Sequence, residues 1–242
     1  EKVPLRLQDE YHRIERMGLR QLREWYTLEA GFPDEPDMER HEFVELLKQV
    51  VRWGMISGEE LRHEYALARQ ELEPPFDEPQ EEEPSRESMI VQLLAWAKMQ
   101  AWEAKGYHAK QIGKVDDVMQ VVVQCANVDL MEWEELLQWY KSAGLPFEKC
   151  LTKAEIGALL KAVTVWHALP LHELLEECRS LECADEDPAW ESDEERRSHL
   201  VDRLLVKNRM REWDSRGYKA TRLGGVNIAI SAVEQYESFL RL

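Results

Sequence analysis

The sequence lacks an excess of basic residues, a long hydrophobic run and a dense cysteine pattern. Its 31 Lys and Arg face 48 Asp and Glu, which gives a formal net charge of −17 over 242 residues. Proteins bind nucleic acids largely by neutralising phosphates with Lys and Arg, so this balance disfavours nucleic-acid binding. It favours other proteins with basic surfaces as partners, including the subunits of a multi-subunit complex.

Hydrophobic runs are short throughout the chain. Val121–Val123 is bounded by Gln120 and Gln124, and even the run Leu93–Ala97 ends at Lys98, whereas a membrane-spanning helix needs roughly 18 apolar residues. We therefore expect no membrane-spanning segment. The first residue is Glu1, so a targeting segment removed on import into an organelle stays possible.

The chain has four cysteines, and none forms a Cys-x-x-Cys pair; they are Cys125, Cys150, Cys178 and Cys183. A small secreted framework has more cysteines at tighter spacing. We therefore expect reduced, mostly buried thiols in an intracellular reducing compartment.

No catalytic or cofactor motif is present. The sequence contains no Gly-x-Ser-x-Gly elbow, no phosphate-binding loop and no calcium-binding loop. His172, Cys178 and Cys183 are spaced too widely for a typical zinc site. We therefore predict no catalytic residue, no cofactor and no metal, and an enzyme with an unrecognised site remains only an alternative.

An internal repeat is the most informative feature that the sequence does contain. Eight residues between positions 94 and 115 recur 111 positions later, in order and without a gap. They are Leu94, Met99, Trp102, Gly106, Tyr107, Ala109, Gly113 and Val115, which return as Leu205, Met210, Trp213, Gly217, Tyr218, Ala220, Gly224 and Val226. Further matches, Trp25-Tyr26 with Trp139-Tyr140 and Gly31-x-Pro33 with Gly144-x-Pro146, are shifted by 114 and 113 positions. We predict a tandem duplication, with an N-terminal half over 1–127 and a C-terminal half over 128–242.

Apolar residues follow helical spacing, which predicts an all-α fold. Leu130, Trp133, Leu136, Leu137 and Tyr140 lie on one stripe of period 3.6, as do Val118, Val121, Val122 and Cys125. Each half is expected to hold two helix–loop–helix units, whose first helices in the N-terminal half run over about 17–30 and 57–72. Capping boxes are predicted at Ser57 with Glu60 and at Thr152 with Glu155.

A closing helix pair is expected to end each half. The first helix of the pair contains Trp102 or Trp213 and ends at Gly106 or Gly217, where glycine favours the left-handed capping conformation. The second helix runs over about 116–126 or 227–240, with Asp116 and Asn227 as N-caps.

Residues 130–160 resemble a SAP module, the short helix–extended loop–helix motif. The matching residues are Leu136, Gly144, Leu145, Pro146, Lys153, Glu155, Ile156 and Leu160. The first unit shares less of this pattern, and the second and fourth share only their helices. The resemblance implies DNA binding through basic residues near the loop, here Lys149 and Lys153. The other units place acidic residues in that region, so nucleic-acid binding is the alternative rather than the leading hypothesis.

Charged loops recur in both halves and supply the candidate partner-binding residues. The basic loops carry Lys105, Lys110 and Lys114 in the first half and Arg216, Lys219 and Arg222 in the second. These cations favour either binding of an anion or a partner, or stabilisation of the helix C-termini through the helix dipole, with the glycines serving the turns. The acidic loops over 71–87 and 182–195 favour either a docking surface for a basic partner or a solvated segment. Trp190 in the second acidic loop is either a partner anchor or a side chain folded back onto a helix.

These observations favour a non-enzymatic interaction or scaffold protein, an accessory structural subunit that docks through its repeated acidic and basic loops. Duplication supports this hypothesis because repeat proteins bind through assembled surfaces.

Overall fold

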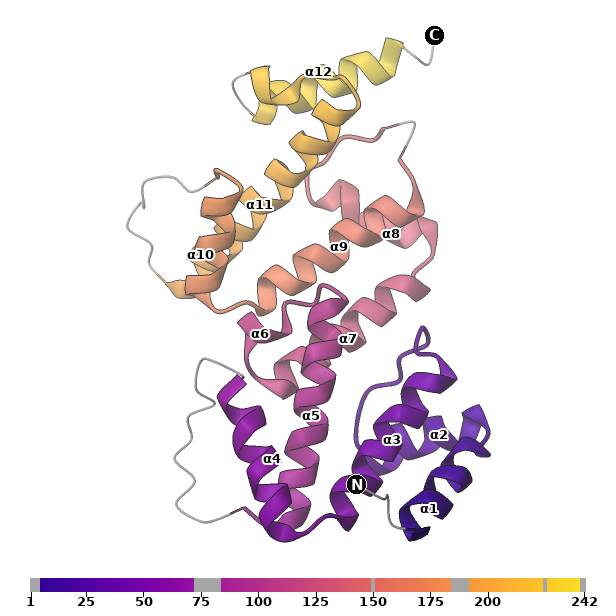
Figure 1. The fold of residues 1–242 in the computed structure, drawn as a ribbon. Coiled ribbons are helices and arrows are strands. Elements are labelled where there is room, and N and C mark those ends of the chain that lie inside the picture. The colour runs from indigo at the N-terminus through magenta and orange to yellow at the C-terminus, as the bar shows by residue number, and fades with distance from the viewer. Residues whose placement is uncertain (1–4, 72–83, 149–150, 184–191, 224–225, 240–242) are drawn as a thin grey trace. The chain divides into compact units, whose positions relative to one another are not determined.

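The part of the chain that the computed structural model describes, residues 5–71, 84–148, 151–183, 192–223 and 226–239, is built from helices (Figure 1). No strand occurs in these ranges, so the predicted all-α class is confirmed. The chain divides into two compact units, residues 1–123 and 124–242. Trp190, Lys149, Cys150 and most of both acidic loops lie outside the described residues.

The first unit contains the helices α1 (Leu5–Glu15), α2 (Leu19–Glu24), α3 (Arg40–Met55), α4 (Gly58–Glu71), α5 (Arg86–Ala104), α6 (Ala109–Ile112) and the start of α7 (Val115–Leu130). α1 packs on α3, and α5 packs on α3, α4 and α6. The predicted box at Ser57 is confirmed, because Glu60 N–H donates to Ser57 Oγ and Ser57 N–H donates to Glu60 Oε2. α1 was not predicted from the sequence.

A π-helical turn, η1 (Trp25–Glu29), extends α2. The Ala30 N–H donates to the Trp25 carbonyl five residues back, over 3.0 Å. The predicted helix over 17–30 therefore exists only from Leu19, and it widens near its end. The π turn presents Tyr26, which is fully buried, to the aromatic core.

Aromatic rings form the centre of the first unit. Tyr26 stacks on Phe32 at 5.2 Å between ring centroids and meets Phe43 edge-on at 5.3 Å. Phe32 in turn meets the Trp102 ring edge-on at 5.9 Å. These rings belong to η1, the loop after it, α3 and α5, so their contacts join these elements. They stabilise the unit because each aromatic side chain buries on the order of 150–250 Å².

The second unit contains the rest of α7, then α8 (Trp133–Ser142), α9 (Lys153–Ala168), α10 (Leu171–Ser180), α11 (Asp193–Ser215), the 3₁₀ turn η2 (Ala220–Leu223) and α12 (Val226–Phe239). α11 packs on α9, α10 and η2. The predicted capping box of Thr152 with Glu155 begins α9 and is confirmed.

The boundaries of the long helices differ from the prediction. α5 and α11 are single helices of 19 and 23 residues, and each contains both the Leu-Leu pair and the Trp that we assigned to successive helices. The predicted N-caps Asp116 and Asn227 are wrong, because α7 and α12 begin one residue earlier and both side chains fall in the first turn. Acidic first-turn residues such as Asp116 still favour a helix N-terminus electrostatically.

None of the described helices is long and apolar enough to cross a membrane.

Candidate functional site

A buried carboxylate organises the loop that follows η1 in the first unit. Glu35 is 2% exposed, and its Oε1 accepts a hydrogen bond from the Tyr26 hydroxyl at 2.5 Å. The ammonium groups of Lys98 and Lys105 lie 2.7 and 3.0 Å from its two oxygens. A second carboxylate, Asp37, also holds Lys105 at 3.0 Å. The loop is thereby tied to α5 through two lysines.

Burial and charge act in opposite directions on this cluster. Burial raises the pKa of Glu35, but the Lys98 ammonium and the hydrogen bonds from Lys98, Tyr26 and Lys105 together outweigh burial and hold that pKa below its ordinary value. Burial lowers the pKa of Lys98 even though Glu35 pulls it upward. The Lys98 Nζ also lies 5.2 Å from the ring centroids of both Tyr26 and Trp102, which favours the charged form.

The second unit has a buried carboxylate in the corresponding loop. Glu148 is fully buried and accepts hydrogen bonds from the Tyr140 hydroxyl at 2.8 Å and from Trp213 Nε1 at 2.8 Å. The Arg209 guanidinium binds it through Nη2 at 2.6 Å and Nε at 3.0 Å, and Arg216 Nη1 lies at 2.7 Å. This carboxylate is therefore saturated by four side chains.

The two networks use different cations, and this changes which polar atoms are satisfied. A guanidinium offers a planar fork of donors, whereas an ammonium is a compact point charge. The Trp213 indole N–H donates to Glu148, but the equivalent N–H of the buried Trp102 has no hydrogen-bond partner. Leaving a buried donor unpaired costs on the order of 1–3 kcal/mol, so the first network is the less complete of the two.

The basic loops begin where α5 and α11 end, and their backbone explains their glycines. Gly106 and Gly217 have φ values of 83° and 91°, and each N–H donates three residues back while the next residue bonds five residues back. This is the Schellman cap, which glycine adopts without a Cβ penalty. The left-handed cap predicted at both glycines is confirmed.

A second feature recurs in the same loops. His108 and Lys219 both have left-handed backbones, at φ 51° and 56°. The Glu103 carboxylate accepts from the Lys110 N–H at 2.9 Å, and the Asp214 carboxylate accepts from the Thr221 N–H at 3.1 Å. Each loop is therefore held at the same two points.

The predicted partner-binding cations fall into two groups. Lys105 and Arg216 point inward, with only 26% and 18% of their side chains exposed, and they pair with buried carboxylates. The remaining cations are exposed on the loops and adjoining turns; they are Lys110, Lys114, Lys219 and Arg222. Lys153, predicted from the SAP resemblance, is exposed at the first position of α9.

Sequence reasoning missed the central members of both networks, Glu35, Lys98, Glu148 and Arg209. Two signals were available. The glutamates end the same Gly-x-Pro-x-Glu pattern, and the cations recur 111 positions apart within otherwise apolar helices. Both signals become visible only when the two halves are aligned and a charged residue within an apolar stripe is treated as a buried partner.

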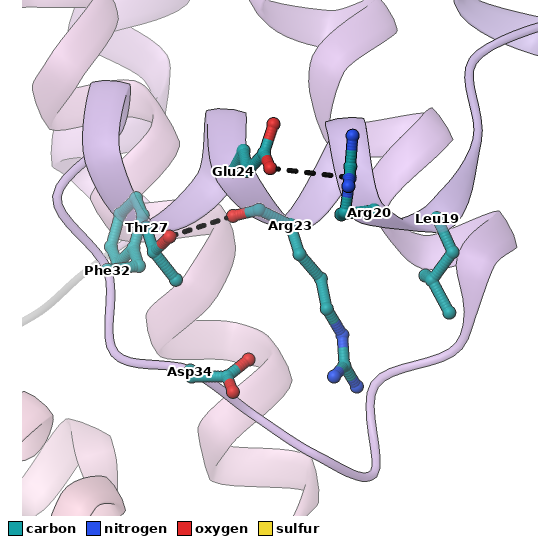
Figure 2. Close-up of a pocket in the computed structure, with 7 residues that line it drawn as sticks. All are labelled: Leu19, Arg20, Arg23, Glu24, Thr27, Phe32 and Asp34. Atoms are coloured by element: carbon teal, nitrogen blue, oxygen red, sulfur yellow. Dashed lines mark hydrogen bonds and ion pairs between the residues drawn. The ribbon is translucent and has the colours of Figure 1, made fainter.

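A hollow of about 680 Å³ opens beside α2 and η1 (Figure 2). Seven residues line it: Leu19, Arg20, Arg23, Glu24, Thr27, Phe32 and Asp34. Several of its polar groups pair locally, since Arg20 Nε lies 3.5 Å from Glu24 and Arg23 Nη2 donates to the Pro36 carbonyl at 3.2 Å, whereas the buried Arg23 Nε has no hydrogen-bond partner. The Thr27 hydroxyl donates to the Arg23 carbonyl at 2.9 Å. This arrangement is an open surface and lacks converging catalytic groups.

The described cysteines are free and buried, and burial sets their chemistry. It raises the pKa of Cys125 to about 11 and that of Cys178 to about 12. Such thiols stay protonated near neutrality and react slowly. In the described ranges no group of three or more His, Cys, Asp or Glu is arranged to hold a metal ion.

No protein-family model, curated protein or solved structure matches the chain.

Proposed function

We propose that this chain is a non-enzymatic interaction protein, an accessory structural subunit of a larger assembly that docks through its repeated loops. One observation carries the proposal. In each unit a buried carboxylate holds the start of the basic loop, through Lys105 or Arg216, while other cations of that loop remain exposed. A rigid frame that presents charge at the surface suits recognition of a partner of opposite charge.

The proposal includes a tandem duplication of SAP-like helix–loop–helix units. The two networks support it, because Tyr26, Glu35, Lys98 and Lys105 have the same roles as Tyr140, Glu148, Arg209 and Arg216. Trp102 and Trp213 are both fully buried beside these networks, although only Trp213 donates to its carboxylate. The cations and tryptophans keep the 111-residue shift of the sequence repeat. Repeats of this kind form extended binding surfaces.

A non-enzymatic role is consistent with how the buried ionisable groups are arranged. Glu148 is fully buried and accepts from four side chains of its own unit, which leaves it no access to a substrate. Active sites usually place perturbed groups in a cleft. In these networks the same kind of group links a loop to a helix.

The test is to purify the protein natively from its source, with and without nuclease, and to identify what accompanies it. A variant carrying Lys110→Glu, Lys114→Glu, Lys219→Glu and Arg222→Glu should lose the partners. A control variant that reverses the exposed Arg6, Arg16, Arg69 and Arg211 changes the net charge equally and should keep them. A fixed protein set that behaves this way supports the proposal.

Two results would overturn it. Isolation of the protein alone and monodisperse would contradict the accessory-subunit role. Partners that vanish with nuclease, and whose binding needs Lys149 and Lys153, would instead indicate nucleic-acid binding.

A further inference from the structure

The last described helix, α12, is apolar on two sides. Ala229 and Val233 are buried, at 0% and 1% exposure, whereas Ile228, Tyr236 and Phe239 are 58%, 54% and 72% exposed. At 100° per residue the three exposed residues fall on one side of the helix. The Tyr236 ring meets the Tyr218 ring edge-on at 5.2 Å between centroids but stays more than half exposed. α12 thus carries an apolar stripe that the described residues cover only in part, and we call it the α12 stripe.

The same register occurs earlier in the chain, where it is covered. Cys125 and Val128 on α7 are three residues apart, like Tyr236 and Phe239, and both are buried. α9 lies against them, since a Cβ on Gly157 would sit 3.8 Å from Val128 Cγ1. Four residues further along α9, Lys161 Nζ lies 2.6 Å from the carboxylate of Asp129.

α1 repeats this arrangement against α3. Tyr11 and Ile14 are again three residues apart, and Ile14 is buried. Lys48 of α3 lies 2.9 Å from the Glu15 carboxylate and 5.6 Å from the centroid of the Tyr11 ring. Val44, four residues before Lys48, is buried as well. In both cases the covering helix has a small or apolar residue four positions before a lysine.

We propose that the α12 stripe binds an amphipathic, lysine-bearing helix of a partner protein, in the way that α3 and α9 cover α1 and α7. The partner helix presents a small or apolar residue to Phe239 and a lysine over the Tyr236 ring, as Lys48 lies over Tyr11. The net charge of −17 draws such a cationic helix towards the chain. This inference rests on the proposed function as an interaction protein.

A second copy of the chain is the less suitable occupant. Its own α3 and α9 have the required chemistry, but α1 and α7 already cover that face. Two copies also repel each other, because each carries a net charge of −17. A separate helix of the same chemistry meets neither obstacle.

The test measures binding of a synthetic helix to the full chain by fluorescence anisotropy. The probe is a labelled peptide of residues 152–169, which carries both Gly157 and Lys161. A hydrocarbon bridge between positions 154 and 158, both exposed on α9, keeps it helical. A matched peptide with Lys161→Glu tests the requirement for the lysine.

We expect saturable binding that Tyr236→Asp and Phe239→Asp each weaken by about tenfold or more, as for truncation of an aromatic anchor. The Lys161→Glu peptide should bind more weakly than the parent. Leu28→Asp, at a position 80% exposed on η1, is the matched control and should change nothing. Phe239 is 72% exposed, so Phe239→Asp is the decisive variant, whereas Tyr236→Asp also removes the ring contact with Tyr218. Circular dichroism of each variant shows that a loss of binding does not reflect unfolding.

Absence of saturable binding, or equal binding by Phe239→Asp, would overturn the inference. Self-association of the chain alone that Phe239→Asp abolishes would show that a second copy occupies the stripe. The native purification separates this failure from that of the proposed function. If the same protein set accompanies Phe239→Asp, the α12 stripe is not the contact, yet the chain remains an interaction protein.

Discussion

At the scale of single residues, the two buried carboxylates show how one cation alters its surroundings. Arg209 binds Glu148 through two nitrogens, and Trp213 donates to the same carboxylate. In the first unit Lys98 binds Glu35 through one nitrogen, and the Trp102 N–H is left without a partner. The two tryptophans are both fully buried, so they form a matched pair that differs in one hydrogen bond.

Replacing these tryptophans by phenylalanine should therefore have unequal effects. Both changes remove similar ring volume, but only Trp213→Phe removes a hydrogen bond to a carboxylate. Because such a bond contributes roughly 1.5–3 kcal/mol, we expect Trp213→Phe to lower the free energy of unfolding by about that much more than Trp102→Phe. Urea unfolding followed by circular dichroism measures both. Equal losses would show that the Trp213 bond contributes nothing net.

Glu35 makes stability depend on pH in a defined direction. Its folded pKa lies below the ordinary 4.5, so the unfolded chain takes up the proton at higher pH than the folded chain. The stabilisation is complete above about pH 4.5 and is lost as the pH falls through the folded pKa. The difference in unfolding free energy between the native chain and Glu35→Gln should shrink from pH 7 towards pH 3.

Urea midpoints at a series of pH values test this prediction. Glu59→Gln, at an exposed position in the first turn of α4, serves as the control and should follow the native profile. A difference between the native chain and Glu35→Gln that stays constant with pH would contradict the assignment of the shifted pKa to Glu35.

At the scale of elements, the sequence predicted the features that depend on residues close together in the chain. The structure confirms the capping boxes at Ser57 and Thr152 and the left-handed backbone conformation of Gly106 and Gly217. Each of these features depends on residues a few positions apart. The unexpected elements depend on distant contacts. α1 was missed because its position is set by packing on α3, and the pairing of Glu148 with Arg209 joins residues that the sequence separates by 61 positions.

The Schellman glycines permit a second matched comparison. Gly217 has a φ of 91°, whereas Gly54 lies within α3, and a Cβ at either position would meet nothing within 4 Å. Any difference between them is therefore conformational. We expect Gly217→Ala to cost about 1–2 kcal/mol and Gly54→Ala to be neutral or to stabilise by up to about 1 kcal/mol. Thermal or urea unfolding checks both, and a neutral Gly217→Ala would refute the left-handed cap.

At the scale of the whole molecule, charge is the dominant property. A net charge of −17 opposes compaction through self-repulsion, and salt shortens the range of that repulsion from about 30 Å at 0.01 M to about 8 Å at 0.15 M. The buried pairs of Glu35 and Glu148 are screened far less. We therefore expect the thermal midpoint to rise as sodium chloride is added over this range.

Differential scanning calorimetry at several salt concentrations measures the effect. A variant with Glu59→Gln and Asp116→Asn, both exposed, carries less charge and should show a smaller rise. A midpoint that falls with salt would mean that exposed ion pairs stabilise the fold more than net repulsion destabilises it.

The π turn at Trp25–Glu29 accounts for a small irregularity in the repeat. Between Tyr26 and Gly31 the first unit has one residue more than the second has between Tyr140 and Gly144, and in the second unit Ala143 bonds to Trp139 in an ordinary α-helical turn. The π turn closes with a hydrogen bond to the residue five positions back, one more than in an α-helical turn, and this wider turn accommodates the additional residue. The first unit thus contains one more residue in this turn, yet the Tyr26 hydroxyl still donates to Glu35 as the Tyr140 hydroxyl donates to Glu148. Insertion or deletion of a single residue, which elsewhere in a packed helix would rotate every later side chain by 100°, is here confined to one turn.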